Sequence, residues 1–122
     1  MNIDQIHSKN ERFRQAAAKM VSLLPQANLV ALSTVMIRSA AKVDKLLPAL
    51  IAVTNEIQFF KTLDRIEEEL DEIVYSLDQL ALRNRELKVP QLDEFIKYGF
   101  DLLSIYSKAC DKMIQVRFKE EA

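Results

Sequence analysis

The apolar residues between positions 59 and 80 are spaced four and three residues apart without interruption. They are Phe59, Leu63, Ile66, Leu70, Ile73, Leu77 and Leu80. An α-helix has 3.6 residues per turn, so this spacing places all seven side chains on one face, as in a helix that packs inside a bundle. Asn55 and Gln58 stand where the N-cap and N3 residues of a capping box would open that helix. The sequence therefore predicts a long bundle helix after Asn55, and we expect Leu70, at its middle, to be fully buried.

Two stretches with the same period come before this helix. The first runs from about Ile6 to Leu24 and ends at Pro25. The second runs from about residue 27 or 28 to residue 53, and we expect Pro48 to kink it or to shift its end. The apolar face predicted for the first helix is Phe13, Ala17, Met20 and Leu24, and that for the second is Leu32, Met36, Ser39, Val43, Leu46, Leu50 and Val53.

A fourth helix is predicted after a polar connection at residues 83–89. Pro90 suits the first turn of a helix, and Asp93 favours the positive end of the helix dipole. Gly99 lies on the apolar face, where it costs about 1 kcal/mol relative to Ala, so we expect a neighbouring backbone to approach it closely. The predicted face is Leu92, Phe95, Gly99, Leu102, Tyr106, Ala109, Met113 and Val116.

These patterns predict an all-α fold, an antiparallel up-down-up-down four-helix bundle. Its connections are short enough to make successive helices antiparallel neighbours. One Gly and three Pro are too few for the tight turns of a β-sandwich or barrel. A length of 122 residues with 49% hydrophobic content fits a single domain over residues 1–122.

The chain lacks the signals of secretion and membrane insertion. Its N-terminus has no apolar segment like that of a signal peptide, and no apolar run approaches the ~18 residues of a membrane span. Cys110 is the only cysteine, which suits a reducing compartment. We therefore expect a cytoplasmic protein with no membrane partner.

The residues of common catalytic and metal sites are scarce. His7 is the only histidine and is expected to be a solvated side chain, so the usual triads and zinc sites have no basis here. Glu68 and Glu72 share a helix face, as two ligands of a hard cation would, but a charged run beside an apolar face is more often solvated. We therefore expect no enzyme activity, no metal or other cofactor and no small-molecule substrate. A metal-dependent enzyme that uses Glu68, Glu69 and Glu72 is a remote third possibility.

Charged residues form two stripes of opposite sign. Arg38, Lys42 and Lys45 share one face of the second helix, and the third helix carries Glu68, Glu69 and Glu72. Because the whole chain has 17 basic and 18 acidic residues, any binding of nucleic acid would be local. The basic stripe would contact RNA or another subunit, and the acidic stripe a subunit. Whether the basic stripe binds phosphate or pairs with the acidic helix stays open at this point.

Apolar residues outside the predicted faces indicate a subunit interface. These residues are Phe60, Val74, Tyr98, Phe100 and Leu103. They widen the apolar surface beyond what a single four-helix core holds. We therefore expect a homo-oligomer, in which the acidic face of one subunit meets the basic face of the next.

The second and third helices resemble the bacterial 23S rRNA intervening-sequence proteins, a family of four-helix bundle proteins. The resemblance spans about residues 31–80, and its matched residues are Ile37, Arg38, Ser39, Val43, Asn55, Gln58, Phe59, Leu63, Glu68, Glu69, Glu72, Tyr75, Leu77 and Leu80. It implies a bundle that assembles into rings, including pentamers, with no known enzyme activity. The leading expectation is thus a non-enzymatic oligomeric binding or scaffold protein of unknown specific role. The alternative is an RNA-binding accessory protein, such as that of a diversity-generating retroelement reverse transcriptase, which a related branch of the family provides.

Overall fold

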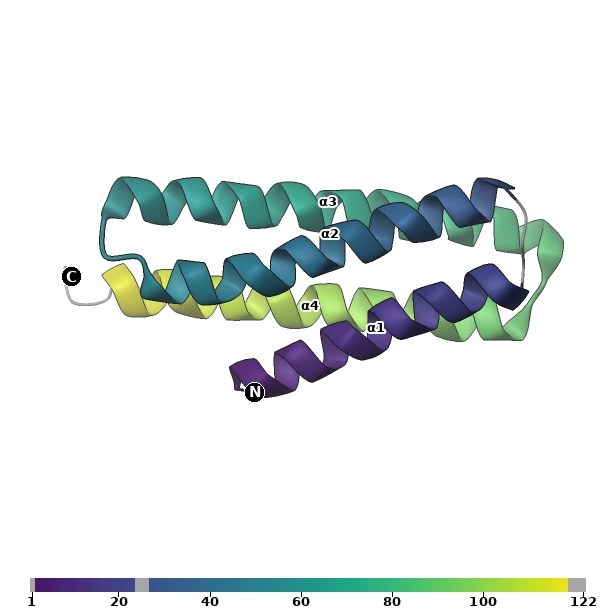
Figure 1. Cartoon of the computed structure of the whole chain (residues 1–122), viewed down its shortest axis with the longest axis horizontal. Coiled ribbons are helices and arrows are strands. Elements are labelled where there is room, and N and C mark those ends of the chain that lie inside the picture. The colour runs from purple at the N-terminus through teal and green to yellow at the C-terminus, as the bar shows by residue number, and fades with distance from the viewer. Residues whose placement is uncertain (1, 24–26, 119–122) are drawn as a thin grey trace.

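The structure is a computed structural model that describes residues 2–23 and 27–118, and this part of the chain forms four α-helices. They are α1 (Ile3–Leu23), α2 (Ala27–Ala52), α3 (Glu56–Leu87) and α4 (Pro90–Phe118). Successive helices run antiparallel, and α1 packs on α2, α2 on α3, α3 on α4 and α4 on α1 (Figure 1). The predicted all-α four-helix bundle is confirmed. None of the described helices has an apolar stretch long enough to cross a membrane.

The core runs along the inside of the bundle and contains most of the predicted apolar faces. Its largest fully buried side chains are Phe13, Met36, Val43, Leu47, Leu50, Phe59, Ile66, Ile73, Leu77, Leu80, Leu92 and Tyr106. On α2, Leu47 takes the place predicted for Leu46, which is half-buried. The prediction for Leu24 lies outside the described residues.

Leu70 is the exception on α3. It is only half-buried, so the prediction that it would be fully buried is wrong. The reason is a groove of about 270 Å³ between α3 and α4, which Leu70 lines together with Val74 and Leu103. Ideal spacing places Leu70 on the correct face of its own helix, but the facing helix does not close over it.

The helix ends follow local chemistry. Asn55 caps α3, and its Oδ1 accepts a hydrogen bond of 3.1 Å from the backbone N–H of Gln58, as predicted. Pro48 does not end α2, which continues to Ala52. Its ring is exposed, and because it has no N–H, the carbonyl of Asp44 lacks its helical hydrogen bond.

The connection between α3 and α4 is shorter than predicted, because residues 83–87 are helical. Lys88 ends α3 in the left-handed conformation (φ 53°, ψ 46°), and its N–H donates to the carbonyl of Asn84. The buried Asn84 side chain accepts from Val89 N–H at 2.9 Å and donates to Asp93 Oδ1 at 2.7 Å. Asn84 therefore holds the first turn of α4 against the last turn of α3, and Pro90 opens α4 as predicted.

Gly99 lies where α4 is tightly packed against side chains of α1 and α3. A Cβ atom there would lie 2.8 Å from both methyl carbons of Leu77 and 3.1 Å from Cε1 of Phe13. The position is closely packed as expected, but the prediction that a neighbouring backbone approaches it is wrong, because side chains of α1 and α3 make the contact.

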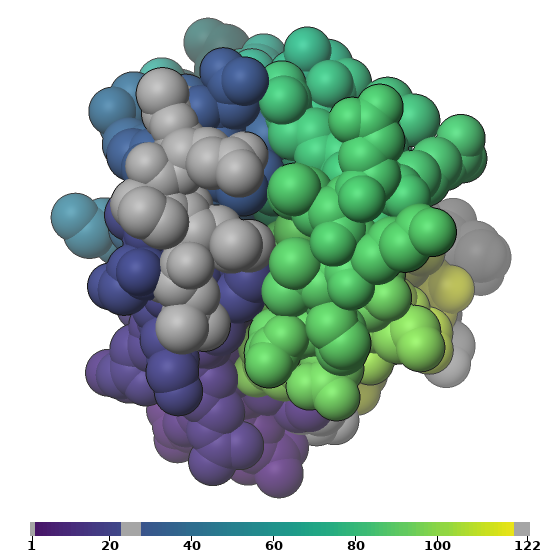
Figure 2. Space-filling view, turned by 90° about the vertical axis from the view of Figure 1, so that its right-hand side faces the viewer, coloured from purple at the N-terminus to yellow at the C-terminus, as the bar shows by residue number. Residues whose placement is uncertain are grey.

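The two ends of the bundle differ. At one end the first turns of α2 lie near the last turns of α3 and the α3–α4 connection (Figure 2). At the other end α1 begins short of the remaining helices, because it has 21 residues and α4 has 29 (Figure 1). The last turns of α2 and α4 therefore extend past the start of α1.

Candidate functional site

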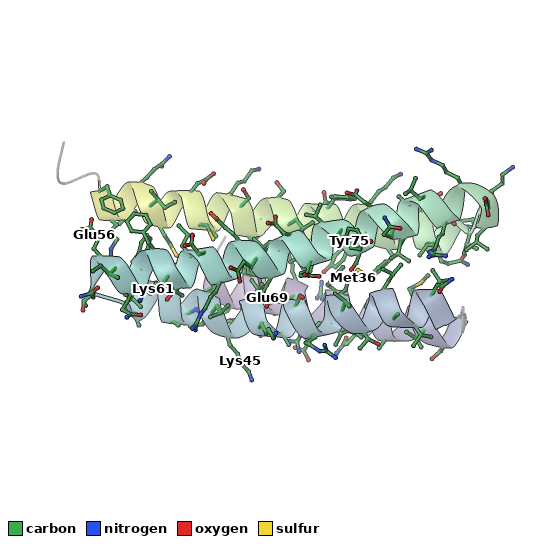
Figure 3. All side chains as sticks on the ribbon, turned by 90° about the horizontal axis from the view of Figure 1, so that it is seen from above. Met36, Lys45, Glu56, Lys61, Glu69 and Tyr75 are labelled. Atoms are coloured by element: carbon green, nitrogen blue, oxygen red, sulfur yellow. The ribbon has the colours of Figure 1, made fainter. Side chains whose placement is uncertain are left out.

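The two predicted charge stripes lie on neighbouring helices and meet at one point. Arg38, Lys42 and Lys45 are all exposed on α2, and Lys45 points away from the bundle (Figure 3). Lys42 Nζ lies 3.4 Å from Glu69 Oε1 across the α2–α3 groove. An exposed pair of this kind contributes at most about 1 kcal/mol.

The rest of the two stripes faces solvent. Glu68 and Glu72 are exposed, whereas Glu69 is half-buried beneath Lys42. Within the described part of the chain, no carboxylate lies within ion-pair distance of Arg38 or Lys45. The structure therefore brings Lys42 and Glu69 together and leaves the other four charges available for contacts outside the subunit.

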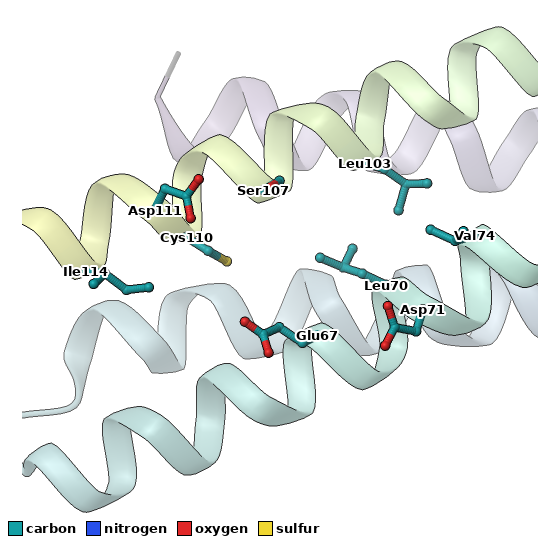
Figure 4. Close-up of a pocket in the computed structure, with 9 residues that line it drawn as sticks. All are labelled: Glu67, Leu70, Asp71, Val74, Leu103, Ser107, Cys110, Asp111 and Ile114. Atoms are coloured by element: carbon teal, nitrogen blue, oxygen red, sulfur yellow. The ribbon is translucent and has the colours of Figure 1, made fainter.

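A second candidate is the groove between α3 and α4 in which Cys110 lies (Figure 4). Besides its apolar residues it is lined by Glu67, Asp71, Ser107 and Asp111. Burial, together with the negative charges of Glu67 and Asp111, raises the pKa of the Cys110 thiol to about 11. The thiol stays protonated at neutral pH, so this arrangement does not make a nucleophile. Among the described residues, no group of three His, Cys, Asp or Glu side chains is placed to hold a metal ion.

His7 lies in a cluster that joins α1 to α2. It is half-buried and hydrogen-bonds to the carboxylate of Asp44, and Arg14 Nη2 lies 3.6 Å from the other carboxylate oxygen. The expectation of a solvated His7 is therefore wrong. The contact arises because antiparallel packing places the start of α1 beside the second half of α2, which the spacing within either helix does not reveal.

A buried polar contact ties α4 to this cluster. Asn10 Nδ2 donates to the hydroxyl of Tyr106 at 2.6 Å and to the carbonyl of Ala40 at 3.0 Å, while Asn10 Oδ1 accepts from Arg14 Nε at 2.9 Å. Burial raises the pKa of Tyr106 to about 12, although the hydrogen bond from Asn10 opposes the shift. Tyr106 is thus a neutral hydroxyl, and Asn10 is the residue that ties α1 to both α2 and α4. The only sequence signal of this contact is Asn10, a polar residue four positions after Ile6 and three before Phe13 on the apolar face of α1.

The apolar residues outside the predicted faces differ in how much of their side chains is buried. Leu103 is buried, and Val74 is half-buried in the α3–α4 groove. Tyr98 is half-buried and its hydroxyl donates to the carbonyl of Lys9 at 3.0 Å. Phe60 and Phe100 remain exposed. Only these last two keep the surface that was predicted for an interface.

An apolar groove lies at the end of the bundle that α1 leaves uncovered, and we call it the end groove. Its volume is about 340 Å³, and it is lined by Ile3, Ile6, Leu47, Ile51, Ala109, Lys112, Met113, Val116 and Arg117. Arg117 also donates to the carbonyl of Val53 at 3.0 Å and lies over the ring of Phe59. Sequence reasoning missed this groove and assigned Val116 to the core, because spacing gives the face of a residue but not how far the facing helix extends.

Comparisons with protein-family models, with curated proteins and with solved structures found no match to this chain.

Proposed function

We propose that this protein is a non-enzymatic, cytoplasmic, homo-oligomeric four-helix bundle that serves as a binding or scaffold module. The observation that carries the proposal is that large apolar side chains remain exposed outside the core. Large apolar side chains that remain exposed on the described helices are Ile51, Ile57, Phe60, Tyr75, Leu82, Phe100 and Val116. Exposed apolar residues that gather in one region mark interaction surfaces.

The chemistry of the interior supports a binding role over catalysis. Among the described residues, Cys110 and Tyr106 have the largest pKa shifts, and both shifts favour the uncharged form. The pKa of a catalytic acid or base is instead shifted toward the pH at which the enzyme works. The resemblance to the 23S rRNA intervening-sequence proteins supports a ring, and it is the sole basis for proposing five subunits.

Light scattering coupled to size exclusion at physiological salt tests this proposal. The expected result is a mass several times the 14.1 kDa of one chain at tens of micromolar protein. A mass near 14.1 kDa under these conditions would rule out the homo-oligomer.

A second candidate is an RNA-binding accessory protein. The exposure of Arg38 and Lys45, which have no ion-pair partner in the described part of the chain, favours it. Binding through such a stripe would weaken with rising salt, because phosphate contacts release counterions. Arg38→Glu with Lys45→Glu should abolish RNA binding, whereas Lys108→Glu, an exposed cation on α4, should leave it unchanged. RNA affinity that responds neither to salt nor to the first pair of changes would contradict this candidate.

A further inference from the structure

Exposed apolar side chains gather at the end of the bundle where α2 passes into α3. Four of the seven large exposed ones lie there: Ile51 (55% exposed), Ile57 (66%), Phe60 (43%) and Val116 (64%). They belong to two separate surfaces. Ile51 and Val116 line the end groove, whereas Ile57 and Phe60 are exposed on the first turns of α3 and do not line it.

The end groove has an apolar floor and a positive rim. Leu47, Ile6 and Met113 form much of the floor, and among the described residues of the lining only Lys112 and Arg117 are charged. It lies in line with α1, beside turns of α2 and α4 that α1 is too short to reach (Figure 1). The groove lies in the space that about two further turns of α1 would fill. Its shape therefore fits the side of another helix, and its positive rim favours a helix that carries acidic residues.

The first turns of α3 form a ridge with that chemistry, which we call the α3 ridge. Ile57, Phe60 and Asp64 are exposed at positions i, i+3 and i+7, so they follow one line along the helix. Residues 56–68 contain four acidic and two basic side chains. The ring of Phe60 stacks on Phe118, with 5.6 Å between centroids. This support lowers the cost of ordering the side chain on binding.

We propose that the end groove binds the α3 ridge of a second copy of this chain. The proposal rests on the homo-oligomer proposed above and identifies its interface. Ile57 and Phe60 fill the apolar floor, and the carboxylate of Asp64 meets the positive rim formed by Lys112 and Arg117. Burial of apolar residues within a rim of opposite charges gives both affinity and register.

The position of the two surfaces decides the kind of assembly. The groove lies where α1 would continue, and the ridge lies on α3, which packs on α2 and α4 rather than on α1. A chain therefore cannot place its own ridge in its own groove, and each copy uses the two surfaces for two different neighbours. Because groove and ridge are different surfaces, the contact is head-to-tail and can repeat around an axis, as a closed ring requires.

Three single substitutions test the interface by light scattering. Ile57→Lys damages the ridge and Val116→Lys damages the groove, and each should shift the wild-type oligomer to the monomer mass at the same protein concentration. Leu82→Lys is the matched control, because Leu82 is an exposed residue of α3 (51%) near its other end. It should keep the wild-type mass. Far-ultraviolet circular dichroism and the urea midpoint check that each variant is folded.

Mixing the Ile57→Lys and Val116→Lys proteins separates the proposed contact from a general loss of apolar surface, because only the proposed contact predicts that the two variants bind each other. Ile57→Lys protein keeps an intact groove and Val116→Lys protein keeps an intact ridge, so a mixture can form one good contact. The expected species is a dimer with twice the 14.1 kDa mass of one chain. A mixture that stays monomeric at hundreds of micromolar overturns the ridge-in-groove contact.

The ionic part is tested by a charge exchange. Lys112→Glu should weaken assembly at least tenfold, and Asp64→Lys added to it should restore most of the loss. If the wild type is an oligomer but Ile57→Lys and Val116→Lys keep its mass, this interface is wrong and the homo-oligomer stands. If the wild type is itself a monomer, the homo-oligomer fails and this interface fails with it.

Discussion

At the scale of single residues, Gly99 shows how a core position can forbid a better helix former. Gly99→Ala gains about 1 kcal/mol of helix propensity, but overpacking costs about 1–3 kcal/mol. Both methyl carbons of Leu77 and a ring carbon of Phe13 would need to move, and both side chains are fully buried. We expect a lower free energy of unfolding, measured by urea denaturation.

A double substitution separates this clash from other causes. Leu77→Ala removes the methyl groups that the new Cβ meets, so Gly99→Ala should cost much less in that background. Ser104→Ala, at an exposed position of α4, serves as the control for helix propensity. An equal or higher urea midpoint for Gly99→Ala alone would show that the core repacks freely around Gly99.

Leu70 and Leu77 form a matched pair on the same face of α3. Leu77→Ala should cost about 2–5 kcal/mol, because it leaves a cavity in a closed core. Leu70→Ala should cost clearly less, since Leu70 lines an open groove and water can enter the space that it leaves. Equal losses in urea denaturation would mean that α4 closes over Leu70 in solution.

These residues also show what the sequence could predict. Spacing identified the inward face of α3 and the special role of Gly99, because both depend on one helix and its period. It did not distinguish Leu70 from Leu77, because that difference depends on how closely α4 approaches. It missed Asn10 for the same reason, since its partners Ala40 and Tyr106 come from two other helices.

At the scale of helices and their connections, the α3–α4 turn depends on Asn84. Asn84→Ala removes its hydrogen bonds to Val89 and Asp93 and leaves the polar groups of Val89 without these partners. We expect a loss of about 1–3 kcal/mol in the free energy of unfolding. Arg85→Ala, one residue further on an exposed face, should change it by less than about 0.5 kcal/mol. Similar urea curves for the two variants would contradict the role given to Asn84.

Helix starts were easier to predict than helix ends. Asn55 and Pro90 carry their signal in their own chemistry, as a side-chain acceptor and as a residue without an N–H. The end of α3 has no glycine, and Lys88 adopts the left-handed conformation instead. The polar residues of this stretch were therefore assigned to a loop, although Arg85 and Glu86 face outward on a helix whose buried residue is Asn84.

At the scale of the whole molecule, the antiparallel order follows from four amphipathic stretches and short connections, but the offset between helices does not. Apolar period fixes which side of a helix faces the core, whereas the axial position of α1 depends on its contacts with α2 and α4. The end groove is a consequence of that offset. The charged stripes could be located from sequence, but the pairing of Lys42 with Glu69 required the packing of α2 against α3.

The stability of the whole bundle should fall at alkaline pH through two buried groups on α4. Folding raises the pKa of Cys110 from 9.0 to about 11 and that of Tyr106 from 10.0 to about 12. The folded state thus holds both protons more tightly than the unfolded state. Their contribution is fully present below about pH 9 and is lost progressively as pH rises toward about 12. Each shift corresponds to a few kcal/mol, at about 1.4 kcal/mol per pKa unit.

Urea denaturation between neutral pH and about pH 11 measures this loss, with the pH range taken from the two shifts. The wild-type free energy of unfolding should decline steeply above pH 9, first through Cys110 and then through Tyr106. Cys110→Ala should remove the earlier part of the decline and Tyr106→Phe the later part, whatever each change costs at neutral pH. Stability must be compared as a slope against pH, because Tyr106→Phe also deprives Asn10 of a hydrogen-bond partner. If both variants lose stability with pH in parallel with the wild type, the two groups are not buried in the folded protein as the bundle places them.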